Sequence, residues 1–206
     1  MSKNVQVLAL NCTLKTTRQK ERTSTDRLLE ECLKAFDKQG ASGEIVRVAD
    51  HNVLPGVSSD EGEGDGWPSL RKKLMESDVL LLGTPIWVGQ PSSLCKRVLE
   101  RMDAFYDEKD DLGRMPSHDK LGCLAVVGNE DGCHYVSAAL YQGLNDLGFT
   151  IPASAITYWV GEAMGDREYA DLRHTPKEVA EATDTMVKNA VHLARLLKQH
   201  HYPSLK

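Results

Sequence analysis

Short apolar runs of strand length alternate five times with amphipathic stretches of helix length along this chain, and few folds accommodate such an alternation. The runs that we expect to form strands cover residues 5–10, 44–49, 78–84, 121–128 and 153–161. The stretches that we expect to form helices cover residues 23–40, 69–77, 91–106, 134–148 and 176 to about 200. Because strands joined through helices pair in parallel, the pattern predicts an α/β protein with helices on both faces of a parallel sheet.

Five strand–helix units in 206 residues predict a flavodoxin-like, doubly wound, five-stranded sheet of order 2-1-3-4-5, in a single domain over residues 1–206. A Rossmann sheet would need a sixth strand, which the pattern does not contain. We expect Thr84-Pro85 to end the third strand, because the residue before a proline is restricted. We also expect Thr175 and Glu178 to form a capping box that opens the last helix, with Pro176 at its first position.

Composition excludes several classes of protein. The formal net charge of −5 argues against a nucleic-acid partner, which would require a basic patch. No run reaches the roughly 18 apolar residues of a membrane span, and no cleavage site follows the short N-terminal apolar run, so we expect a cytoplasmic protein. The five cysteines include no C-x-x-C pair, and we expect no metal site and no dithiol redox pair.

Ligands of open parallel sheets bind beyond the carboxyl ends of the strands, so the loops that follow the strands are the informative ones. The loop over residues 11–25 is rich in hydroxyls and cations and leads into a helix, whose N-terminus favours an anion. An ordinary solvated loop with a Ser or Thr cap is the alternative. The loop matches neither G-x-x-x-x-G-K-[ST] nor G-x-G-x-x-G.

Two further loops carry candidate binding residues. After the third strand, Ile86, Trp87 and Val88 offer apolar surface, and Gly89 lets the backbone approach a ligand closely. After the fourth strand, residues 128–132 form a polar turn between two glycines, which suits contacts to the polar edge of a ring. A Trp that only packs, and a plain tight turn, remain the alternatives for these two loops.

Taken together, the three loops resemble those of the NADPH-dependent FMN reductase family of flavodoxin-like proteins. The family signature [ST]-P-[IV]-[YW]-x-G is met by residues 84–89, its hydroxyl-bearing first loop by Thr13 and Ser24-Thr25, and its glycine-bracketed loop by residues 128–132. The end of the first strand departs from the family, because Asn-Cys-Thr-Leu-Lys at residues 11–15 replaces the usual Gly-Ser or Ser-x-Arg.

The resemblance implies a role for each loop. Thr13, Ser24 and Thr25 would hold the phosphate of FMN. Lys15 or Arg18 would meet either that phosphate or the 2′-phosphate of NADPH, and the sequence leaves both open. The residues implied to line the isoalloxazine ring are Pro85, Ile86, Trp87, Val88 and Gly89. The residues implied to meet the polar side of the ring are Gly128, Asn129, Glu130, Asp131 and Gly132.

The activity that the resemblance implies is hydride transfer from NADPH or NADH to bound FMN and onward to a small acceptor, such as a quinone, flavin, azo or nitro compound. The flavin would carry this chemistry, so no side chain is expected to be catalytic. Family analogy also implies a homodimer.

Three other functions compete with this one. A flavodoxin-type electron carrier would dock through a strongly acidic surface, for which a net charge of −5 is weak. A non-catalytic flavin-binding or scaffold protein is a further alternative. A low-molecular-weight tyrosine phosphatase would use Cys12 and Arg18 in C-x5-R, but Gln19 follows the arginine and the chain contains no Asp-Pro.

Overall fold

The computed structural model describes residues 4–206. Residues 1–3 belong to the N-terminal stretch in which we looked for a signal-peptide cleavage site, and they lie outside the described residues. One sheet runs through the molecule, with strands in the order β2-β1-β3-β5-β6. Its members are β1 (Val5–Asn11), β2 (Ala41–Arg47), β3 (Val79–Trp87), β5 (Leu121–Gly128) and β6 (Ile156–Val160), all paired in parallel. Counted without the two-residue β4 (Gln90–Pro91), this is the predicted order 2-1-3-4-5, and the predicted fold is confirmed.

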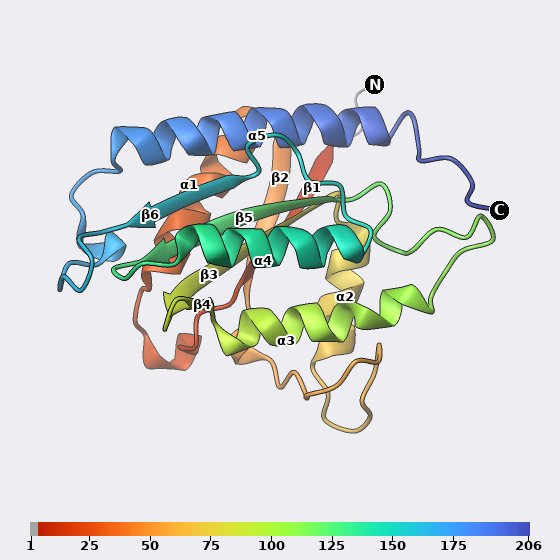
Figure 1. The fold of residues 1–206 in the computed structure, drawn as a ribbon, viewed down its shortest axis with the longest axis horizontal. Coiled ribbons are helices and arrows are strands. Elements are labelled where there is room, and N and C mark those ends of the chain that lie inside the picture. Colours follow the sequence, from red (N-terminus) through yellow and green to blue (C-terminus); the bar gives the residue numbers. More distant parts are fainter. Residues whose placement is uncertain (1–3) are drawn as a thin grey trace.

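Helices cover both faces of the sheet (Figure 1). The α-helices are α1 (Ser24–Lys38), α2 (Trp67–Glu76), α3 (Ser93–Met102), α4 (Cys133–Asp146) and α5 (Lys177–Leu197). Four 3₁₀ turns separate them among the described residues: η1 (Thr17–Gln19), η2 (Val48–Asp50), η3 (Asp103–Tyr106) and η4 (Tyr169–Asp171). Helices α1 and α5 pack on one face, whereas α2, α3 and α4 pack on the other.

Alternating side chains of the buried strands divide the core into two layers. Along β3, Val79 and Leu81 face α1 and α5, whereas Leu80 and Leu82 face the other three helices. All four side chains are fully buried. A strand that is covered on both faces must be apolar at every position, which explains the continuous hydrophobic run in the sequence.

The prediction that Thr84-Pro85 ends the third strand is wrong. Strand β3 continues to Trp87, and Pro85 pairs with Val127 of β5. The carbonyl of Gly83 accepts a hydrogen bond from Cys12 at the end of β1, so the backbone of Pro85, two residues later, also faces the β1 side. Strand β1 has no further register pair at that point, so the missing N–H of Pro85 leaves no partner unsatisfied.

Two other boundaries differ from prediction. Strand β2 begins at Ala41, immediately after Gly40 ends α1 with a positive φ of 72°, and the residues after Arg47 turn into η2 instead of extending the strand. The expected capping box of the last helix does not form: Pro176 is the N-cap, and the Thr175 hydroxyl donates to Glu31 of α1 at 2.8 Å.

A buried ion pair holds the long loop between β2 and α2 against α3. Arg101 and Asp65 are both fully buried, with 2.7 Å between Nη2 and Oδ2. The other donors of Arg101 reach the Ser58 and Leu54 carbonyls at 2.9–3.0 Å. Burial by itself raises the pKa of the Asp65 carboxyl, but hydrogen bonds from Arg101 and backbone amides outweigh this effect and hold the pKa below its ordinary range.

The other long loop lies far from the carboxyl ends of the strands. Residues 107–120 precede β5 and carry the C-terminal segment, since Tyr202 donates to Asp119 at 2.8 Å and Leu205 donates to Leu112 at 2.8 Å (Figure 1). Within the described residues, no helix combines the length and apolarity needed to cross a bilayer.

We predict that Arg101→Met destabilises the protein by about 3–5 kcal/mol, because Asp65 and two carbonyls lose their buried partner. Urea unfolding measures this loss. Lys96→Met is the matched control on the same helix, since its ion pair with Glu100 is exposed and should contribute less than about 1 kcal/mol. Equal losses in the two variants would contradict the structural role of the buried pair.

Candidate functional site

The loops that follow β1, β3 and β5 meet around one cavity of about 350 Å³ at the carboxyl edge of the sheet. The first loop and the start of α1 contribute Thr13, Leu14, Lys15, Glu21, Arg22, Thr23, Ser24 and Thr25. The ends of β3 and β5 contribute Pro85, Trp87, Val127, Gly128 and Asn129. The segment after β6 contributes Glu168, Ala170 and Asp171. The cavity therefore joins hydroxyls at a helix N-terminus to a rim of apolar and main-chain surface.

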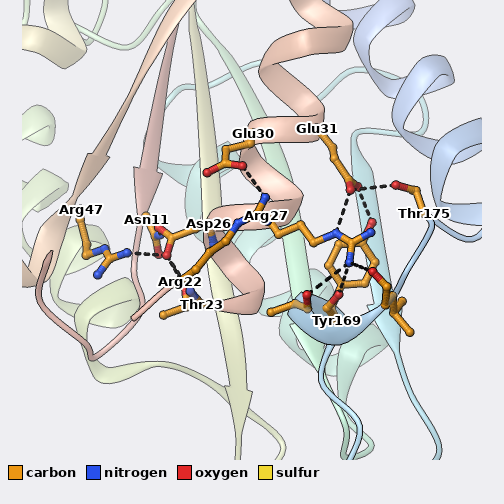
Figure 2. Close-up of polar contacts among 12 residues, drawn as sticks. Asn11, Arg22, Thr23, Asp26, Arg27, Glu30, Glu31, Arg47, Tyr169 and Thr175 are labelled. Carbon is orange, nitrogen blue, oxygen red and sulfur yellow. Dashed lines mark hydrogen bonds and ion pairs between the residues drawn. The ribbon is translucent and has the colours of Figure 1, made fainter. Parts of the chain in front are cut away.

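The carboxylate of Asp26 organises the first wall of the cavity (Figure 2). It accepts hydrogen bonds from the side-chain amide of Asn11 at 2.6 Å and from the backbone N–H and hydroxyl of Thr23 at 2.8 and 2.9 Å. Arg47 of β2 forms an ion pair with it. Asn11 in turn accepts from the Thr13 backbone at 2.9 Å, so one carboxylate connects β1, β2 and the first turn of α1.

Asp26 is ionised at neutral pH in this setting. Partial burial by itself raises the pKa of the Asp26 carboxyl, but the hydrogen bonds from Arg47 and Thr23 outweigh it, so the pKa lies below its ordinary value. The wall of the cavity thus depends on a charge that persists well into the acidic range.

A tight hairpin forms the opposite rim. Strand β3 turns into β4 through Val88 and Gly89, which both have positive φ, 53° and 69°. Positive φ at both central residues is typical of a type I′ turn, and it is strained for a β-branched valine. The hairpin leaves Trp87 53% exposed at the mouth of the cavity.

The glycine-bracketed loop packs directly against this hairpin. A Cβ at Gly132 would lie 2.8 Å from the Gly89 Cα, which no side chain tolerates. At its other end, Asn129 donates its side-chain amide to Gly165 at 2.7 Å and accepts from the Met164 backbone at 2.7 Å. Asn129 therefore ties the segment after β6 to the cavity.

That segment brings a carboxylate to the start of α1. The Ser24 hydroxyl donates to Glu168 at 2.8 Å and accepts from the Ala170 backbone at 3.1 Å. Arg27 fixes the backbone around them, donating to the Tyr169 and Leu172 carbonyls at 2.8 and 2.5 Å. Its guanidinium also lies 4.8 Å from the centre of the Tyr169 ring.

Glu31 completes this attachment from the next turn of α1 (Figure 2). It accepts hydrogen bonds from Arg27 at 3.0 Å, from Thr175 at 2.8 Å and from the Tyr169 hydroxyl. The segment is thus held at η4 and again just before α5, and its side chains are presented to the cavity from a fixed backbone.

The structure brings part of the predicted site together. The predicted residues that line the cavity are Thr13, Lys15, Ser24, Thr25, Pro85, Trp87, Gly128 and Asn129. Those outside its lining are Arg18, Ile86, Val88, Gly89, Glu130, Asp131 and Gly132. Arg18 is exposed on η1, and Ile86 is 3% exposed in the core, where it fills the space beside Gly128.

Sequence reasoning missed the contribution of residues 168–171. They lie in a polar stretch without strand or helix periodicity, and only their position after the fifth strand could have indicated them. It also missed Asp26 and Arg47, whose pairing joins segments that are far apart in the sequence.

The phosphatase alternative is wrong. Cys12 is fully buried, and a side-chain hydrogen bond with Cys95 together with burial raises the pKa of its thiol well above the ordinary value. A nucleophilic thiolate needs the opposite environment, exposed and electropositive.

The residues present fit the phosphate and ring of FMN. The hydroxyl of Ser24, the first residue of α1, already donates to the anionic oxygen of the Glu168 carboxylate, so this helix terminus suits an anionic ligand. Thr13, Ser24 and Thr25 would hold the phosphate, and Pro85, Trp87 and the Gly128 backbone would line the ring.

The sequence matches that of the NADPH-dependent FMN reductases over residues 5–164. The chain therefore belongs to this family, and it is an FMN-dependent oxidoreductase.

Individual relatives are also related to flavins. The 8-demethyl-8-aminoriboflavin-5'-phosphate synthase of Streptomyces davaonensis is 32% identical over 96% of this chain and 80% of its own. The crystal structure of RosB with the bound intermediate 8-demethyl-8-formylriboflavin-5'-phosphate has a TM-score of 0.86 and 31% identity, covering 96% of this chain and 82% of that one. The apo form of the NADH:FMN oxidoreductase EMOB has a TM-score of 0.67 over 94% of this chain and 89% of its own, and at 14% identity it shares the fold.

We predict that Asp26→Asn lowers the free energy of unfolding by roughly 1–3 kcal/mol at pH 7, because Arg47 and Thr23 lose a charged acceptor. Since folding lowers the pKa of Asp26, its contribution is complete above the unfolded value of about 3.9 and is lost as the pH falls through the folded value. The difference between wild type and variant should therefore shrink below about pH 4.

Urea unfolding between pH 7 and pH 2.5 measures this difference. Asp37→Asn, an exposed carboxylate later in the same helix, is the control and should stay within about 0.5 kcal/mol of wild type. A deficit of Asp26→Asn that is independent of pH would contradict the argument.

Proposed function

We propose that this protein transfers hydride from NADPH or NADH through bound FMN to a small acceptor of the quinone, flavin, azo or nitro class. When bound, the flavin supplies the hydride chemistry, taking two electrons from the nicotinamide and passing them to the acceptor. The protein's residues bind the cofactor, orient it and limit the access of water.

The observation that carries the proposal is the convergence of two unlike surfaces on one cavity. The Ser24 and Thr13 end offers hydroxyls and the start of a helix, which suit a phosphate. The Pro85 and Trp87 end offers apolar surface beside the Gly128 backbone, which suits a flat heterocycle. Because Leu14 and Trp87 are about half exposed, at 49% and 53%, a second small molecule can approach the same mouth.

A second candidate function is modification of the flavin ring itself. It is favoured by the 32% identity to the aminoriboflavin-phosphate synthase and by the TM-score of 0.86 to a structure holding a flavin-phosphate intermediate. In that case the same cavity binds a flavin phosphate as substrate, and the molecule must leave after each turnover.

We further propose a cytoplasmic homodimer. Large side chains are exposed in the β3–β4 turn, after β6 and in the first turn of α4: Val88 is 88%, Met164 is 86% and Tyr135 is 57% exposed. A second copy that covers these side chains would remove them from water, consistent with the dimer that the family resemblance implies.

We predict that the protein binds FMN with a change in the flavin spectrum and that anaerobic NADPH or NADH bleaches the visible absorption of the bound flavin. Addition of a quinone should restore the colour. A flavodoxin-type carrier would bind FMN without being bleached by either nucleotide, and that result would overturn the reductase.

Mass spectrometry of the flavin released after turnover separates the two candidates. An unchanged mass supports FMN as a resident cofactor, whereas a changed mass identifies the flavin as the substrate. A phosphotyrosine analogue serves as the negative control and should not be hydrolysed, since the Cys12 thiol is buried.

A further inference from the structure

We propose that Glu168 is a specificity-determining residue which weakens the hold on the flavin phosphate and so makes FMN exchangeable. The inference rests on the proposed binding of FMN with its phosphate at the start of α1. It concerns a residue that lies beyond the stretch matched to the family, residues 5–164.

Glu168 already uses a donor that a flavin phosphate would need. The hydroxyl of Ser24, the first residue of α1, donates its hydrogen bond to the Glu168 carboxylate at 2.8 Å. A phosphate oxygen that binds there needs the same donor, because the Ser24 hydroxyl has one proton and its oxygen already accepts from Ala170 at 3.1 Å. Phosphate and Glu168 therefore compete for one donor.

The charges around the cavity also disfavour a phosphate. The side chains around the cavity include three carboxylates, Glu21, Glu168 and Asp171, and two cations, Lys15 and Arg22, so the lining has a net negative charge. Both cations already have partners, since Lys15 pairs with Glu21 and Arg22 pairs with Glu30 at 2.5 Å. A phosphate dianion placed at Ser24 thus meets the Glu168 charge, while both cations that line the cavity are engaged with other carboxylates.

The backbone that carries Glu168 is held in place by α1. Arg27 binds the carbonyls of Tyr169 and Leu172, and Glu31 binds Thr175, so the segment on either side of η4 is tied to α1 (Figure 2). Glu168 is itself exposed, so its side chain can rotate toward solvent while the backbone stays in place. A bound phosphate therefore displaces the Glu168 carboxylate from Ser24, which lowers the affinity for FMN, and the Ser24–Glu168 hydrogen bond forms again when FMN dissociates.

Glu168 should affect the binding of flavins that carry a phosphate and not the binding of those that lack it. Riboflavin has the same ring but no phosphate, so it does not displace the carboxylate from Ser24. Replacement of the carboxylate by its neutral amide should strengthen the binding of FMN and leave that of riboflavin unchanged.

The test compares dissociation constants of FMN and riboflavin, measured by quenching of flavin fluorescence, for the wild-type chain and Glu168→Gln. We expect FMN to bind roughly three- to tenfold more tightly to the variant, a modest factor because the carboxylate is exposed and screened. Riboflavin should bind within about twofold of wild type. Glu162→Gln is the matched control, because it removes the same charge from the same segment outside the cavity lining and should change neither constant.

An FMN constant that is unchanged or weaker in Glu168→Gln, or an equal gain for riboflavin, overturns the proposal. Circular dichroism checks the fold, and Glu168→Ala, with the same expected selectivity, replaces the amide variant if that variant fails to fold. If the wild-type chain binds neither flavin, the proposed function itself fails; if it binds both and ignores the substitution, only the role of Glu168 fails.

Discussion

The site depends on one ionised carboxylate, that of Asp26. Three segments at the same edge of the sheet each direct a donor at it: Asn11 at the end of β1, Arg47 at the end of β2 and Thr23 before α1. Asp26 satisfies all three, and each contact is only partly exposed to water, where charge-assisted hydrogen bonds are strongest. The hydroxyls at the start of α1 are therefore presented to the cavity in a fixed arrangement before any ligand arrives.

The fold could be predicted from the sequence because the patterns that specify strands and helices are local. Apolar runs such as that of β3 specify burial on both faces, and five of them separated by helices leave one sheet order that fits the length. The same reasoning located the loops of the site, since strand ends share an edge. The predictions were wrong where tertiary contacts overrode a local rule. Pro85 continues β3 because no strand lies beside its missing N–H. Thr175 bonds to Glu31 instead of capping its own helix.

The side chains of the site could be predicted only in part. The positions of Ser24, Trp87 and Gly128 at strand and helix ends could be predicted from the sequence, and these residues line the cavity. Ile86 belongs to the same short motif, but strand alternation turns it into the core beside Gly128. Glu168 lies 144 residues from its partner Ser24, and no pattern in the sequence records that contact.

Arg27 couples two walls of the cavity to one helix. The matched family region ends at residue 164, yet part of the cavity wall comes from residues 168–171, which α1 holds through Arg27 and Glu31. The anchoring bonds come from a single helix, so α1 supports one cavity wall with its own first turn and a second wall through the segment that it holds. A shift of α1 against the sheet would therefore move both walls together, and the width of the cavity is coupled to the packing of this one helix.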